Sequence, residues 1–156
     1  MRPAPAPARF PALALPALDG GVRDLSRVDR PTLVSLGHGE CPTTRLLLPY
    51  VERIHRGRRP GTDVVVVLQD TPADARALAA DLALSAPILL DEPPFSLGAA
   101  LQAHTVPLSL LVAPGGRIER AWPAFRRQDL EEAAALLGVP PPLFAPDDPA
   151  PALRPG

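Results

Sequence analysis

The sequence predicts a single α/β domain in which parallel strand–helix units are followed by an antiparallel hairpin and a closing helix. Two observations predict this class. Short apolar runs of strand length alternate with capped or amphipathic helical runs along most of the chain, and a Gly-Gly turn at 115–116 then joins two further strands. At 156 residues the chain is long enough to bury a core as one domain.

The N-terminal segments predict an arm, a hairpin and a buried strand. Residues 1–9 alternate Ala and Pro, which favours a flexible Pro-rich arm before a domain over residues 10–138. The Asp-Gly-Gly sequence at 19–21 separates two short strand-like segments as the turn of a hairpin. Ser26 is expected to cap a short turn, and the apolar run 32–36 predicts a buried strand.

The central part of the chain predicts two helices and a central strand. Apolar residues at helical spacing predict a helix that begins near Pro42, and Pro49 is expected to interrupt and kink it. The run 64–68, four valines and a leucine, is typical of a central parallel strand. Thr71 supplies an N-cap and Pro72 a first-turn proline, which together favour the start of a second helix.

The C-terminal half predicts the remaining elements by the same signals. Gly138 ends the last helix, and residues 139–156 form a Pro-rich tail that Leu143 and Phe144 could hold against the domain. The expected elements are a strand over 87–90, a short helix over 94–103, a hairpin from 108–112 and 117–122, and a helix over 128–137.

Charge and composition exclude several kinds of partner. A net charge of −1 and a pI near 6.3 leave no electrostatic footprint for nucleic acid or for an anionic membrane. No apolar run reaches the about 20 residues of a membrane span, and the first residues lack the apolar core of a signal peptide. A single cysteine cannot form an internal disulfide, which agrees with a reducing compartment. The expected location is therefore the cytoplasm.

Cys41, the only cysteine, lies between the strand run 32–36 and the helix that begins at Pro42. A thiol at the first turn of a helix lies near unpaired backbone N–H groups and the positive end of the helix dipole, which both lower its pKa. Thr44 could donate a hydrogen bond to the sulfur, whereas the carboxylate of Glu40 acts in the opposite direction. The alternative is an inert buried cysteine, which its glycine-rich, polar flanks disfavour.

A second feature is Val106-Pro107, immediately before the strand run 108–112. A proline that enters a strand after a β-branched residue is a candidate for a cis peptide bond. Spacing alone favours the trans form, because cis bonds are uncommon even before proline.

Taken in order, these segments resemble a thioredoxin-like redoxin, close to the TlpA-like and AhpC/TSA branches. The resemblance implies a central mixed sheet flanked by helices, with an N-terminal β-hairpin. It also implies that Pro107 is cis, that Val106 and Pro107 form a substrate-facing wall opposite Cys41, and that Pro42 and Thr43 contact the substrate. The segments that carry the resemblance are Asp19-Gly20, Cys41-Pro42, Val64 to Asp70, Pro87 to Asp91, and Val106-Pro107 before 108–116.

The active-site tetrapeptide departs from the TlpA-like pattern. TlpA-like proteins carry two cysteines as CxxC, and this chain has Thr44 at the second position. A lone thiolate can attack a disulfide, but an external thiol must then release the mixed disulfide. That thiol is expected to be a low-molecular-weight thiol or a thioredoxin-type protein. The leading hypothesis is monothiol disulfide exchange or deglutathionylation through Cys41, without a cofactor.

Two other functions stay open. Cys41-Pro42-Thr43 also resembles the peroxidatic Cys-Pro-Thr of peroxiredoxins, in which peroxide converts the thiolate to a sulfenic acid. Peroxiredoxins carry a threonine three residues before that cysteine, where this chain has His38. The remaining hypothesis is a degenerate thioredoxin-like module that binds a partner without turnover.

His38 and His104 could both lie near the sulfur, because His38 is three residues before Cys41 and His104 is three residues before Pro107. Two imidazoles and a thiolate could hold zinc or copper. No second thiol or carboxylate completes the set with motif spacing, so no metal is expected. We expect His38 instead to shuttle a proton or to pair with the thiolate.

Overall fold

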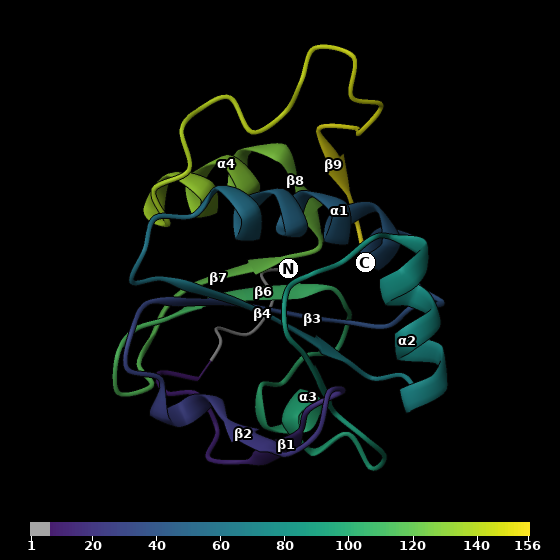
Figure 1. The fold of residues 1–156 in the computed structure, drawn as a ribbon, viewed down its shortest axis with the longest axis vertical. Coiled ribbons are helices and arrows are strands. Elements are labelled where there is room, and N and C mark those ends of the chain that lie inside the picture. The colour runs from purple at the N-terminus through teal and green to yellow at the C-terminus, as the bar shows by residue number, and fades with distance from the viewer. Residues whose placement is uncertain (1–6) are drawn as a thin grey trace.

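A five-stranded mixed sheet forms the centre of the computed structural model, which describes residues 7–156 (Figure 1). The strands of the chain are β1 Ala14–Pro16, β2 Val22–Asp24, β3 Thr32–Gly37, β4 Asp63–Leu68, β5 Ile88–Leu90, β6 Leu108–Val112, β7 Ile118–Pro123, β8 Phe125–Arg126 and β9 Leu153–Arg154. The central sheet has the order β5-β4-β3-β6-β7. Strands β3, β4 and β5 are parallel, β6 runs antiparallel to β3, and β7 runs antiparallel to β6. The mixed α/β architecture is confirmed.

Helices cover both faces of this sheet. They are the 3-10 turn η1 Leu25–Arg27 and the α-helices α1 Pro42–Gly57, α2 Pro72–Asp81, α3 Ser96–Ala100 and α4 Arg127–Leu136. Figure 1 shows α1 and α4 on one side of the sheet, and α3 with the β1-β2 hairpin on the other. None of the helices within residues 7–156 is long and apolar enough to cross a membrane.

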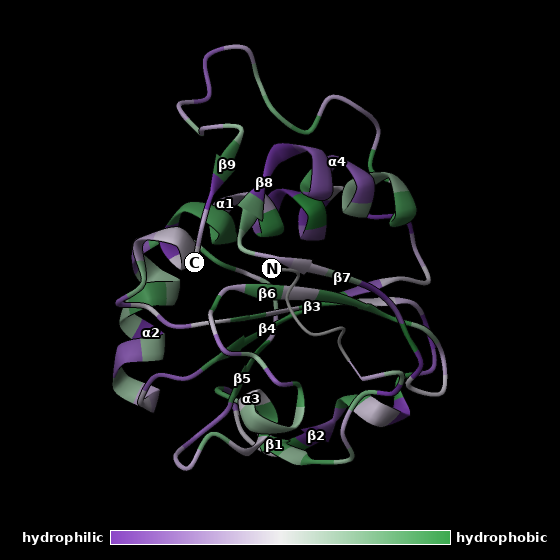
Figure 2. Cartoon of the chain, turned by 180° about the vertical axis from the view of Figure 1, so that it is seen from behind, coloured by the Kyte–Doolittle hydropathy of each residue, from purple (hydrophilic) through white to green (hydrophobic). Residues whose placement is uncertain are grey.

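The central strands are buried because helices or the hairpin cover both faces of the sheet. All six residues of β3 and five of the six in β4 are buried, as expected for strands of apolar, β-branched residues. Alternate side chains point to opposite faces, so Val64 and Val66 join the core under α1, while Val65 and Val67 join the core under α3. Figure 2 shows these strands mostly in the hydrophobic colour.

Helix α1 begins at Pro42, where the missing N–H of proline leaves no helical hydrogen bond unmade. The helix continues through Pro49, so the expectation that this proline interrupts it is wrong, whereas a kink there stays a prediction. Buried Leu48 and Tyr50 flank this proline, and both side chains join the same core cluster as residues of the sheet, which holds the two halves of the helix on the sheet. The helix is also tied to the loop before β5, because Glu52 accepts the backbone N–H of Ser85 at 2.8 Å.

The predicted hairpin forms from β1 and β2, and its following turn is capped differently from the expectation. Asp24, not Ser26, is the N-cap of η1, because its carboxylate accepts both the backbone N–H and the hydroxyl of Ser26. Of the arm predicted over residues 1–9, residues 1–6 lie outside the described residues. Ala8 accepts the Ile118 N–H at 2.9 Å, so this end of the arm lies along β7.

The C-terminal segment, residues 139–156, packs back onto α1 and α4. Leu143 and Phe144 are buried, as their apolar character predicts. The Phe144 ring lies 4.6 Å from that of Tyr50 on α1, measured between centroids. Strand β9 then pairs antiparallel with β8, with Phe125 opposite Arg154. This pairing brings the end of the segment next to the start of α1 (Figure 1).

Candidate functional site

Cys41 lies in the turn that joins β3 to α1, at the carboxyl end of the parallel strands. It is the N-cap residue of α1, and its backbone N–H donates to the His38 carbonyl at 3.0 Å. Asp70, just after β4, accepts the Gly39 N–H on both carboxylate oxygens at 3.0 Å. These bonds fix the turn, and the cysteine it carries is partly exposed.

Gly37 allows the first turn of α1 to approach the end of β3. A Cβ at Gly37 would lie 2.5 Å from Thr44 Cγ2 and 2.9 Å from Thr44 Oγ1, so a larger residue would not fit without a shift. Thr44 is fully buried in this contact, and its hydroxyl accepts the His38 N–H at 3.3 Å. The hydroxyl of Thr44 is therefore held beside the turn that carries the cysteine.

The surroundings of Cys41 lower the pKa of its thiol from the ordinary value of 9.0. Burial is the largest single influence and raises the pKa, but the backbone and side-chain donors of Thr44, followed by those of Thr43, together outweigh it. In the thiol form, the Cys41 side chain accepts no capping hydrogen bond from α1. The donors of the first turn therefore lower the pKa by stabilising the charged thiolate rather than the neutral thiol. The direction agrees with the prediction for a cysteine at a helix N-terminus.

Val106 and Pro107 lie across from the cysteine. The peptide bond between them is cis. Cys41 Sγ donates to the Val106 carbonyl at 3.6 Å. Pro107 is buried and Val106 is half-buried, so the backbone rather than a side chain forms the surface nearest the sulfur. The structure thus brings Cys41 against the pair of residues that the family resemblance places opposite it.

The charged neighbours of Cys41, Arg45 and Glu40, do not account for its lowered pKa. Arg45 Nε donates to the Gly39 carbonyl at 2.6 Å, and the guanidinium pairs with Asp81 at 3.5 Å. Glu40 is exposed, and solvent screens exposed charges. The lowered pKa of Cys41 therefore comes from hydrogen-bond donors of the first turn rather than from these charges.

The two histidines do not assemble a metal site with the cysteine. Within residues 7–156, no group of three or more His, Cys, Asp or Glu side chains could hold a metal ion. His38 Nδ1 accepts the Glu40 N–H at 3.1 Å, so this nitrogen is occupied while the turn is intact. His104 is exposed in the loop before β6. A proton-transfer role for His38 stays a prediction, and it would fall to Nε2.

Solved structures match this architecture. DsbE from Chlorobium tepidum, a candidate thiol:disulfide interchange protein, matches with a TM-score of 0.74 and 23% identity over 85% of this chain and 96% of that chain. DsbF from Mycobacterium tuberculosis matches with a TM-score of 0.70 and 19% identity over 85% and 99%. The thioredoxin domain of a thiol-disulfide oxidoreductase from Bacteroides vulgatus matches with a TM-score of 0.70 and 18% identity over 86% and 98%.

The chain has a thioredoxin-like fold. The resemblance seen in the sequence is therefore confirmed for the central mixed sheet and for the N-terminal hairpin. No protein-family model and no curated protein matches the sequence. At these identities the likeness concerns the fold, so the chemistry has to be argued from the residues around Cys41.

Two residues at this site of the thioredoxin-like fold come from the C-terminal segment and were not predicted from the sequence. Thr43 Oγ1 donates to the Pro155 carbonyl at 2.6 Å. A Cβ on Gly156 would lie 2.9 Å from the carbonyl carbon of Val106, so Gly156 rests directly on that residue. A Pro-rich tail has no periodicity from which such contacts could be inferred.

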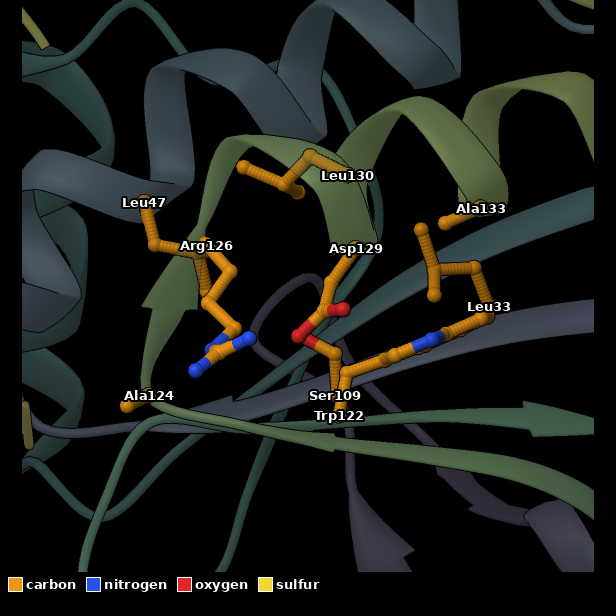
Figure 3. Close-up of a pocket in the computed structure, with 9 residues that line it drawn as sticks. All are labelled: Leu33, Leu47, Ser109, Trp122, Ala124, Arg126, Asp129, Leu130 and Ala133. Carbon is orange, nitrogen blue, oxygen red and sulfur yellow. The ribbon is translucent and has the colours of Figure 1, made fainter. Parts of the chain in front are cut away.

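A separate pocket lies between α4 and the sheet (Figure 3). The side chains of Arg126 and Asp129 both extend into it, and Asp129 lies toward Ser109 (Figure 3). Burial raises the pKa of Asp129, and the nearby Arg126 partly offsets this. Cys41 does not line this pocket, which is therefore distinct from the candidate site. Its lining residues are Leu33, Leu47, Ser109, Trp122, Ala124, Arg126, Asp129, Leu130 and Ala133.

Proposed function

We propose that the protein exchanges thiols and disulfides through Cys41 by a monothiol mechanism. One observation carries the proposal: the only cysteine of a thioredoxin-like fold lies at the first turn of α1, with a lowered pKa, and faces the Val106 carbonyl. The thiolate is the attacking form in disulfide exchange. A lowered pKa supplies more of that form near neutral pH.

In the first step, the Cys41 thiolate attacks one sulfur of a substrate disulfide. A new S–S bond forms with Cys41, the substrate S–S bond breaks, and the second substrate sulfur leaves as a thiolate. The hydroxyl of Thr44 and the amides of the first turn stabilise the attacking charge before this step. Val106 and Pro107 bound the site on the side opposite the helix.

The second step needs a thiol from outside the chain, because Thr44 cannot act as a resolving group and no other cysteine exists. The thiolate of this external reductant attacks the substrate sulfur of the mixed disulfide and releases the Cys41 thiolate. A low-molecular-weight thiol or a thioredoxin-type protein fits this role. When the sulfur bound to Cys41 comes from glutathione, the net reaction is deglutathionylation.

The pKa of Cys41 and its reaction with a small disulfide test the proposal together. The pH profile of alkylation by iodoacetamide should have its midpoint below 9.0. Incubation with oxidised glutathione should add one glutathione to Cys41 by mass spectrometry, and added free thiol should remove it. A midpoint at or above 9.0, with no glutathione adduct, would overturn the proposal.

Dilute hydrogen peroxide separates this function from a one-cysteine peroxidase. A peroxidase forms a sulfenic acid at Cys41 faster than it reacts with oxidised glutathione, whereas an exchange protein shows the reverse order. A Cys41→Ser variant tests the remaining alternative. If that variant keeps full cellular function, the protein is a binding module rather than an enzyme.

A further inference from the structure

Residues 153–156, here called the terminal segment, lie along one side of the Cys41 site. Figures 1 and 2 both show the chain passing through β9 and running down beside the start of α1. All four residues are exposed, so the burial of apolar side chains does not explain the position of this segment. Their position is set by backbone contacts.

The terminal segment touches both walls of the site. On the helix side, the Pro155 carbonyl accepts the hydroxyl of Thr43 at 2.6 Å. On the opposite side, Gly156 packs against Val106, where a Cβ would come within 2.9 Å of the carbonyl carbon. Cys41 Sγ donates to the carbonyl of the same Val106. The terminal segment therefore lies between the two surfaces that flank the sulfur.

The terminal segment is held in place by anchors that are distant from the sulfur. The backbone N–H of Arg127 donates to the Ala152 carbonyl at 3.0 Å, next to the β8-β9 pairing. The Arg127 side chain donates to the carbonyls of Ala150 and Asp148. Arg53 forms a bidentate pair with Asp148, at 2.6 and 2.9 Å. These bonds offset the entropy lost when an extended segment is ordered.

We propose that the terminal segment makes Cys41 selective for small disulfides by occupying the place that an extended polypeptide would need. An extended polypeptide binds through its backbone polar groups. Here the hydroxyl of Thr43 is already used by Pro155, and the backbone at Val106 is covered by Gly156. Cys41 nevertheless stays partly exposed, so a small disulfide can reach the sulfur. This inference rests on the proposed function and specifies its substrate class.

The test compares two disulfides, oxidised glutathione and insulin, on the full chain and on a form that lacks residues 153–156. The deletion should raise the rate of mixed-disulfide formation with insulin by about tenfold, a change that corresponds to about 1.4 kcal/mol in the barrier. The rate with oxidised glutathione should stay within about twofold of that of the full chain.

A point variant keeps the test independent of the deletion. Gly156→Val should displace the segment end from Val106 and raise the insulin rate, because its Cβ has no space beside the Val106 carbonyl. Ala152→Val, at the exposed position just before the terminal segment, is the matched control. It should change neither rate, because Ala152 anchors the segment only through its backbone carbonyl, which the substitution keeps. Melting curves check that each variant is folded.

The outcomes separate the two proposals. If the insulin rate is unchanged in both the deletion and Gly156→Val, the proposed selectivity is overturned. An equal rise in rate for both disulfides also overturns it, because the segment would then control only the general exposure of the thiol. If no form reacts with oxidised glutathione, the proposed function itself fails and the selectivity fails with it.

Discussion

Thr43 and Pro155 are 112 positions apart in the sequence, yet the Thr43 hydroxyl donates to the Pro155 carbonyl at 2.6 Å. Thr43 is buried in the first turn of α1, two residues after Cys41. The backbone N–H of Thr43 therefore contributes to the lowered pKa of Cys41, while the hydroxyl of the same residue holds the terminal segment. Thiol reactivity and access to the sulfur are coupled through it.

Replacing the Thr43 hydroxyl should loosen the terminal segment. Thr43→Val removes the donor, and a typical hydrogen bond contributes about 0.5–1.5 kcal/mol, so amide hydrogen exchange over residues 150–156 should become several-fold faster. Thr43→Ser keeps the hydroxyl and should preserve the protection. Equal exchange in both variants would show that the anchors at Arg127 and Arg53 hold the segment without Thr43.

Thr44→Val should raise the pKa of Cys41, because it deletes a hydroxyl that stabilises the thiolate. The folded-state pKa of the acidic thiol is lowered, so the thiolate is favoured above that pKa and is lost as the pH falls through it. The midpoint of iodoacetamide alkylation should therefore move to higher pH in Thr44→Val and stay in place in Thr44→Ser. A midpoint that does not move in the valine variant contradicts a role for this hydroxyl.

Thr44→Cys should restore an internal resolving thiol. Thr44 lies one turn into the helix on the side of Cys41, and cysteine is close to threonine in size, so the buried site can accept it. The mixed disulfide between Cys41 and glutathione should then decay without added thiol. Mass spectrometry over time measures this decay. A mixed disulfide that is as stable as in the unmodified chain would show that a thiol at position 44 does not reach the Cys41 sulfur.

Glu52 should make the folded state sensitive to acid. Burial raises its pKa, but the side chain of Arg56 and three donors from Ser85 and Ala86 lower it more, to about 2 from 4.5. The stabilisation is complete above pH 4.5 and is lost as the pH falls from 4.5 toward 2. Glu52→Gln should lower the free energy of unfolding by about 1–3 kcal/mol at pH 7.

Urea denaturation of both forms at pH 7 and pH 3 checks the Glu52 prediction. The difference between the two forms should shrink at the lower pH, because protonation removes most of the charge that the variant lacks. A difference that stays constant across this range would mean that the carboxylate charge does not contribute.

Asp148 should hold the C-terminal segment in a pH-dependent way. A hydrogen bond from Arg53 and the backbone N–H of Ala145 lower its pKa to about 2 from 3.8. The pair is therefore intact above pH 3.8 and is lost as the pH falls toward 2. Asp148→Asn should speed limited proteolysis within residues 139–156 at neutral pH. The control variant Asp147→Asn, changed at an exposed neighbouring position, should be cleaved by the protease at the same rate as the unmodified chain.

The sequence by itself determined most of the fold and the centre of the candidate site. Apolar runs such as 64–68 specify buried strands, and the proline at 42 specifies a helix start, because these signals depend on residues adjacent in the chain. The placement of Cys41 at that helix start, and the direction of its pKa shift, follow from the same local order. Local capping was less predictable, since Asp24 took the role expected of Ser26.

Only the tertiary structure decided what surrounds the sulfur. The contacts of Cys41 with Val106, of Thr43 with Pro155 and of Gly156 with Val106 join residues that are far apart in the sequence. No local signal encodes such contacts, because the first depends on how β3 pairs with β6 and the other two on how β8 pairs with β9. The sequence located the reactive thiol, and the tertiary structure determined how far a substrate can approach it.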